Sequence, residues 1–172
     1  MNEQVFYYAI IELGVSILLG VLILYFAYRI LDKYLRKKYD IDLNTSYSIF
    51  CSSILFSVAY LISGIKTPIL NSIRLLQDKV DYEGLLLFDG FKYTALFLVI
   101  TLIVIAFVNI LSIFLFTIMT RDLDEFDEIK NNNIGVSIIL AIIIISISLL
   151  VKDSLYLLLE SFVPYPSMPT FN

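Results

Sequence analysis

Four long stretches of apolar residues dominate this sequence, and they restrict it to folds that reside in a membrane. One charge, Glu12, interrupts residues 5–28, and none falls within residues 46–65, 93–120 or 134–151. Each stretch nears or exceeds the ~20 apolar residues that a helix needs to cross a bilayer. The composition, 59% apolar and 16% charged with a mean hydropathy of +0.88, is far from that of a soluble domain. We therefore expect an all-α protein with four transmembrane helices.

The second and fourth stretches begin alike, with NTSYSI from Asn44 and NNIGVSI from Asn132. Aligning Asn44 with Asn133, an offset of 89 residues, brings several small residues into register. Each repeat holds two spans, so both repeats enter the membrane in the same sense and are parallel rather than inverted. We predict a single transmembrane domain over residues 1–172, made of repeat one (1–66), an amphipathic loop (67–91), repeat two (92–152) and an interfacial or disordered tail (153–172).

Lysine and arginine near the ends of the spans predict the orientation, because these residues favour the cytoplasmic side. Seven lie in the first and third loops, against five in the second loop and the tail. This excess predicts that the first and third loops are cytoplasmic and that both termini lie outside. Three basic residues of the first loop, Arg36, Lys37 and Lys38, are candidates for contact with anionic headgroups of the lipid bilayer. The net charge of −4 gives no support to nucleic-acid binding.

Three segments carry a resemblance to a known family: FYYAIIELGVSILLGVLILYF, YDIDLNTSYSIFCSSILFSVAYLISGI and FDEIKNNNIGVSIILAIIIISISLL. The chain resembles the domain-of-unknown-function 350 family of four-helix bacterial inner-membrane proteins. Asn44 and Asn133 match the asparagine of that family's Gly-Asn-x-Ala-x-Ala pattern, whereas serines and a glycine replace its alanines. The resemblance implies two helical repeats and an inner-membrane location. It implies no agreed activity, and it suggests envelope stress or defence as the setting.

Two polar residues inside the spans are candidates for buried or pore-lining roles. Glu12 is the one ionisable side chain within the four stretches, and such a group is costly in the bilayer unless it has a function or a partner. It lies about 10 Å inside at 1.5 Å per residue, so a shallow, hydrogen-bonded carboxyl is the alternative. Asn109 lies near the middle of the third span, where interhelical hydrogen bonding and pore lining are both open to it.

The two aligned asparagines lie at expected helix starts, where an Asn side chain accepts from free backbone N–H groups. Capping explains Asn44 and Asn133 without any ligand. The third loop, RDLDEFDEIKNNN, has five acids against two bases. Three of its acids, Asp124, Asp127 and Glu128, are candidates for docking a partner. The calcium-loop pattern is incomplete there, since the turn glycine is missing and Phe126 stands at a ligand position, so we predict no metal site.

The sequence lacks the residue sets that catalysis requires. It has no histidine, no phosphate-binding glycine loop and a single cysteine, Cys51, with no base beside it. We therefore expect no catalytic residues and no cofactor. The function we expect is that of a non-enzymatic, homo-oligomeric membrane subunit or sensor that docks a soluble cytoplasmic protein. The alternative is a small oligomeric ion channel or pore, with Glu12 and Asn109 near the path.

Overall fold

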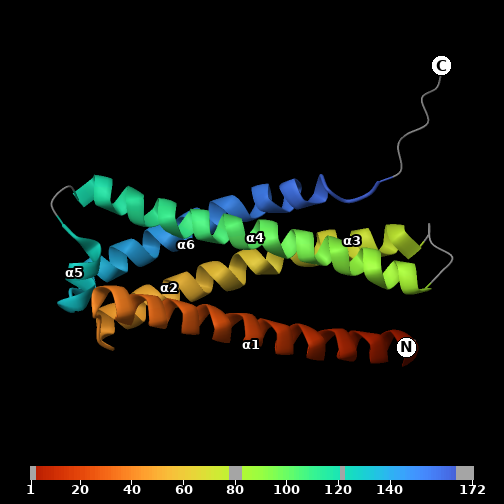
Figure 1. Cartoon of the computed structure of the whole chain (residues 1–172), viewed down its shortest axis with the longest axis horizontal. Helices are drawn as coiled ribbons and strands as arrows, with labels where there is room; N and C mark the ends of the chain where they lie inside the picture. Colours follow the sequence, from red (N-terminus) through yellow and green to blue (C-terminus); the bar gives the residue numbers. More distant parts are fainter. Residues whose placement is uncertain (1–2, 78–82, 121–122, 166–172) are drawn as a thin grey trace, which may run out of the picture.

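The computed structural model describes residues 3–77, 83–120 and 123–165; the side chains of most of residues 3–19, of 77 and of 83–87 are not described. All the regular structure in these ranges is helical (Figure 1). In chain order the elements are α1 (Glu3–Tyr39), α2 (Thr45–Ile62), the 3-10 turn η1 (Ser63–Ile65), α3 (Lys66–Gln77), α4 (Glu83–Thr120), α5 (Glu125–Lys130) and α6 (Ile134–Glu160).

Three of these helical runs are long and apolar enough to cross a membrane. They are Thr45–Leu76, which joins α2, η1 and α3, then Phe88–Thr120 in α4 and Ile134–Glu160 in α6. At 1.5 Å per residue, runs of 32, 33 and 27 residues exceed the ~30 Å hydrocarbon core. Large apolar side chains on α1, α4 and α6 are exposed, as expected for helices surrounded by lipid. The fold is therefore all-α, and its long apolar helices indicate a multi-pass membrane protein.

Local sequence explains where the helices begin and end. The last turn of α1 holds Arg36, Lys37 and Lys38, whose positive charges suit the negative end of a helix dipole. The chain leaves α1 through Asp40, which adopts a left-handed backbone conformation with φ of 51°. Asparagines then cap α2 and α6, and neither of these helices contains a proline.

The two central helices, α2 and α6, run in the same direction and pack together more extensively than any other pair (Figure 1). α1 and α4 both run the opposite way. α1 packs on α2 and α5, whereas α4 packs on α6, α2 and α3. The chain thus forms two helical hairpins, α1 with α2 and α4 with α6, that are joined mainly through their second helices.

Small side chains let α2 and α6 approach closely. Serines of both helices are buried along their spans; they are Ser46, Ser53, Ser57, Ser137 and Ser148. Apolar clusters flank this seam at both ends. One surrounds Tyr47, Phe50 and Leu140 near the helix starts, and the other surrounds Leu61 and Leu159 toward the opposite end.

The described parts of the segment expected as an amphipathic loop, residues 67–77 and 83–91, belong to two helices. α3 follows α2 through η1 and packs against α4, while the remainder includes the first turns of α4. Asn71 of α3 donates to Glu160 Oε1 at the end of α6 over 2.9 Å, and Tyr165 donates to the same oxygen. The first part of the expected tail, residues 153–160, is the end of α6; residues 166–172 lie outside the described residues.

Candidate functional site at the polar corner

Polar side chains gather where the end of α1, α5 and the starts of α2 and α6 meet, an end of the bundle that we call the polar corner. Asn44 lies at its centre. Its Oδ1 accepts from the backbone N of Tyr47 over 2.7 Å and so caps α2. Its Nδ2 donates to the carbonyl oxygens of Ile129 and Lys130, at 2.9 and 3.3 Å. One side chain therefore binds the start of α2 and the end of α5.

The asparagines after α5 complete this arrangement. Asn132 has a left-handed backbone, φ 60°, a conformation that Asn tolerates better than most residues. Its Oδ1 accepts from Ser46 N over 3.1 Å, which satisfies a second free N–H of α2. Asn133 caps α6 through Val136 N at 3.4 Å and donates to Glu128 Oε2 at 2.6 Å. The starts of both central helices are thus tied to the α5 segment.

The short helix α5 is fixed at its own start by acidic residues. Asp124 is its N-cap, and Oδ1 accepts from Phe126 N and Asp127 N at 3.0 and 3.2 Å. Glu125 is buried, and its Oε1 accepts from Thr117 of α4 over 2.8 Å. The Phe126 ring stacks on Tyr39 of α1, with centroids 4.1 Å apart. α5 therefore contacts α1, α2, α4 and α6 through specific side chains.

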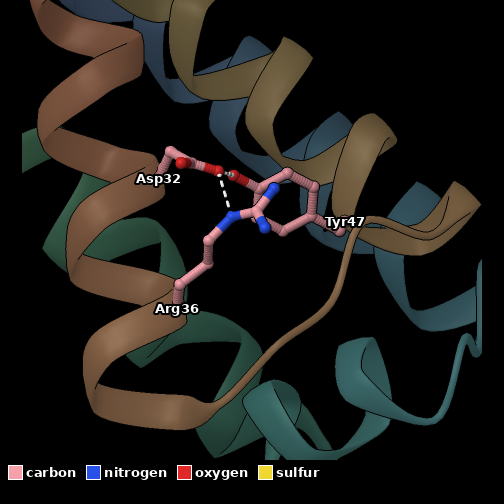
Figure 2. Close-up of polar contacts among 3 residues, drawn as sticks. All are labelled: Asp32, Arg36 and Tyr47. Atoms are coloured by element: carbon pink, nitrogen blue, oxygen red, sulfur yellow. Dashed lines mark hydrogen bonds and ion pairs between the residues drawn. The ribbon is translucent and has the colours of Figure 1, made fainter.

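A three-residue cluster joins α1 to α2 at the polar corner (Figure 2). Tyr47, 1% exposed, donates its hydroxyl hydrogen to Asp32 Oδ1 over 2.6 Å. Arg36, one turn along α1, donates through Nε to the same oxygen over 2.8 Å. These hydrogen bonds, that from Tyr47 first, hold the pKa of Asp32 below its usual value. Asp32 is therefore a carboxylate at neutral pH.

The three basic residues expected to contact headgroups differ in their contacts within the protein. Arg36 is engaged by Asp32, whereas Lys37 is exposed. Lys38 donates to the Tyr34 hydroxyl over 2.8 Å and lies over the rings of Tyr34 and Tyr39. The hydrogen bonds to these tyrosines raise the pKa of Lys38, so this side chain is positively charged at neutral pH.

The candidate docking acids differ in the contacts that their side chains make within the protein. Asp127 is exposed and, among the described residues, makes no ion pair. Asp124 and Glu128 both carry structural hydrogen bonds, the first as a cap and the second from Asn133. Lys130, the basic residue of α5, lies 3.4 Å from Asp40. The outer surface of α5 is consequently acidic. Within the described ranges, no three acidic or cysteine side chains converge as a metal site.

Of the two polar residues expected within the spans, the structure describes the side chain of Asn109 and not that of Glu12. Glu12 belongs to α1, but its side chain lies outside the described residues. Asn109 of α4 donates to Ile105 O at 2.8 Å and to Ser57 Oγ of α2 at 3.4 Å. Ser57 also accepts from Ser148 of α6 over 2.8 Å. Asn109 thus connects three helices, and its Oδ1 has no partner among the described groups.

Sequence reasoning missed the residues that join separate elements. The spacing of Asp32 and Arg36, four apart on one helix, is typical of an ion pair and was available as a signal. Nothing in the sequence pairs Asp32 with Tyr47, or Glu125 with Thr117, because these contacts depend on how the helices pack.

Comparison with other proteins adds one finding to this geometry. No curated protein and no solved structure matches the chain. The family model described as Domain of Unknown Function (DUF350) matches residues 3–155, which include α1 through most of α6. That is the greater part of the sequence, and it confirms the resemblance noted above. The chain belongs to the DUF350 family.

Proposed function

We propose that this protein is a non-enzymatic membrane subunit or sensor that docks a soluble partner on the acidic surface of α5. In this proposal it is a homo-oligomer of the bacterial inner membrane and serves an envelope-stress or defence system. The observation that supports docking is the way in which α5 is attached to the bundle. The helix has only six residues, yet Asn44, Glu125 and Phe126 attach it to the bundle while Asp124 and Asp127 face outward. A short helix held in this way presents its charges in a fixed geometry.

The proposed topology has α1 as a fourth span and two tandem hairpin repeats. Its support is the common direction of α2 and α6 and their matching asparagine caps. The length of α1, 37 residues, is also sufficient to cross a bilayer. The excess of lysine and arginine near the polar corner favours a cytoplasmic position for this end. Both termini then lie outside, and α5 faces soluble proteins of the cytoplasm.

The test must remove charge from α5 without unfolding it. Asp124→Asn keeps a good N-cap, and Glu128→Gln keeps an acceptor for Asn133. Asp127 is exposed, and its change to asparagine alters no described hydrogen bond of the side chain. The triple variant therefore changes three charges and preserves the fold. A control carries Asp42→Asn and Asp153→Asn, and so removes two exposed acids outside α5.

Affinity purification from native membranes, with mass spectrometry of the captured proteins, is the measurement. We expect a stoichiometric soluble partner with the wild type and the control, and its loss from the triple variant at equal membrane insertion. Equal recovery from all three proteins contradicts docking through α5. Recovery of a bare oligomer from the wild type contradicts a docking function altogether.

The contacts of Asn109 bear on the alternative of an ion channel. An ion path requires the amide to face water, whereas its Nδ2 bonds to Ile105 and Ser57 inside the chain. An interhelical hydrogen bond of this kind stabilises a membrane bundle by about 0.6–2 kcal/mol. The geometry therefore favours a structural role for Asn109, and we keep docking as the proposed function.

A further inference from the structure

An apolar groove opens between α1, α2 and α4, on the side of the bundle where α1 and α4 are not in close contact. The groove has a volume of about 560 Å³, within the usual range for a site that holds a small organic molecule. Its walls include Ile23 and Leu31 of α1, Ile54 of α2, and Leu98 and Ile113 of α4. Packing of the chain alone leaves this space open.

The lining of the groove excludes a polar occupant. Asn109 and Tyr34 are the polar residues among those that line it. The Asn109 Nδ2 and the Tyr34 hydroxyl are engaged elsewhere, and the Asn109 Oδ1, which has no partner among the described groups, is buried. Asn109 donates to Ser57 and Ile105, and the Tyr34 hydroxyl accepts from Lys38. A buried apolar surface favours a hydrocarbon, because water or an ion would find no hydrogen-bond partners there. The groove therefore suits an acyl chain.

The length of the groove agrees with one leaflet of a bilayer. Along α1 it extends from Ile23 to Leu35, which is about 18 Å at 1.5 Å per residue. The hydrocarbon core of a bilayer is about 30 Å thick, so one leaflet is about 15 Å. An acyl chain that lay along this part of α1 would match the depth of one leaflet.

A cationic hollow adjoins the groove. Ile30, Lys33, Tyr34, Lys37 and Lys38 line it, and the groove shares Ile30 and Tyr34 with it. The shared Tyr34 also accepts the hydrogen bond from Lys38, which places an ammonium group beside the junction. Arg36 is turned away toward Asp32, so lysines rather than this arginine form the hollow. The lysine ammonium groups thus lie beside the groove, where the phosphate of a lipid would lie if its acyl chain occupied the groove.

We propose that α1, α2 and α4 form a binding site for one anionic phospholipid, with an acyl chain in the groove and its phosphate on Lys33, Lys37 and Lys38. The charge complementarity identifies the occupant: a zwitterionic lipid would place its own cation against the three lysines. Lysine near a membrane surface attracts anionic lipid by about fivefold in affinity per residue. This site is independent of the docking proposed for α5.

The test is competitive lipid binding to the full chain, with phosphatidylglycerol and phosphatidylcholine as the probes. Protein purified in mild detergent receives both lipids in equal amounts, and native mass spectrometry counts those retained. The first variant carries Lys33→Gln, Lys37→Gln and Lys38→Gln. Its control removes the same number of charges elsewhere, through Arg74→Gln, Lys92→Gln and Lys130→Gln. A second variant, Ala106→Phe, fills the groove from α4, and Leu150→Phe on the exposed face of α6 is its control.

We expect the wild type and both controls to retain phosphatidylglycerol in preference to phosphatidylcholine, by at least about tenfold. The lysine variant should lose this preference, and Ala106→Phe should lose bound lipid of both kinds. Equal retention of the two lipids by the wild type overturns the proposal, as does an unchanged preference in the lysine variant. If Ala106→Phe instead breaks an oligomer and leaves lipid retention intact, the groove holds a helix of a second copy and the lipid site is wrong.

Discussion

The hydroxyl of Tyr47 lies 2.6 Å from Oδ1 of Asp32, and this hydrogen bond joins the buried start of α2 to the last turns of α1. Arg36 shares the same oxygen. The first hairpin is therefore closed by a charge-assisted contact at its polar end, where helices leave the apolar interior. Such contacts are stronger than those between neutral groups.

Tyr47→Phe should lower the free energy of unfolding by about 1–2 kcal/mol, because it removes one hydrogen bond to a carboxylate and keeps the ring in place. Unfolding followed by circular dichroism in mild detergent measures this. The pH dependence gives a second test. The folded pKa of Asp32 is below its unfolded value, so the stabilisation is complete above the unfolded pKa and is lost as pH falls through the folded one. An unchanged acid profile in Asp32→Asn would contradict this.

Substitutions of Asn44 should separate its two roles. Asn44→Asp retains the cap on α2 but loses the donor to Ile129 and Lys130, whereas Asn44→Ala loses both. We expect the alanine variant to be less stable than the aspartate variant by about 1 kcal/mol, the usual contribution of an N-cap. Both variants should expose the α5 segment to protease. Protection equal to that of the wild type would show that Asn44 does not hold α5.

Asn109 and Ser57 should show coupled energetics. Asn109→Leu and Ser57→Ala each remove one partner of the same interhelical hydrogen bond. The double variant should therefore lower the free energy of unfolding by less than the sum of the two single variants. The expected coupling is within about 0.6–2 kcal/mol, measured by unfolding in detergent. Ser52→Ala, at an exposed position of α2, is the matched control. Strict additivity would mean that the 3.4 Å contact contributes nothing.

Asp40→Gly should stabilise the end of α1. The left-handed conformation at φ 51° costs an L side chain about 1 kcal/mol, and glycine adopts it freely. The variant also loses the exposed ion pair with Lys130, a contact of small value. Asp40→Val should have the opposite effect, because a β-branched residue is strained there. Thermal unfolding of both variants, compared with the wild type, gives the sign of each change.

Cysteine labelling should establish the orientation. In a Cys51→Ser background, Asp127→Cys marks the polar corner and Asp153→Cys marks the far part of α6; both positions are exposed. With the polar corner in the cytoplasm, an impermeant maleimide should label Asp153→Cys on intact cells and Asp127→Cys only after permeabilisation. The reverse pattern would invert the proposed topology. Cys51 itself is buried and should remain unlabelled in the folded protein.

The sequence was most informative where the structure depends on local pattern. Uninterrupted apolar runs predicted long helices, and the all-α fold and family membership are confirmed. The joining of α2 and α3 into one long run was not predicted, because residues 67–91 were expected to form an amphipathic loop separate from the span. The pairings of Asp32 with Tyr47 and of Glu125 with Thr117 could not be predicted from one sequence. These contacts form only when separate helices pack together, and no spacing of residues in the sequence indicates which side chains will then meet.

The attachment of Asn44 to both α2 and α5 has a mechanical consequence. The same α5 segment also bonds to the start of α6 through Glu128 and Asn133. A force applied to α5 from outside the bilayer would therefore pull on the first turns of the two central helices together. Buried serines line the middle of the contact between those helices, and large apolar side chains pack at both of its ends, so the two helices are held to each other along their length. A load on the polar corner is thus shared between α2 and α6 and is not carried by either helix alone.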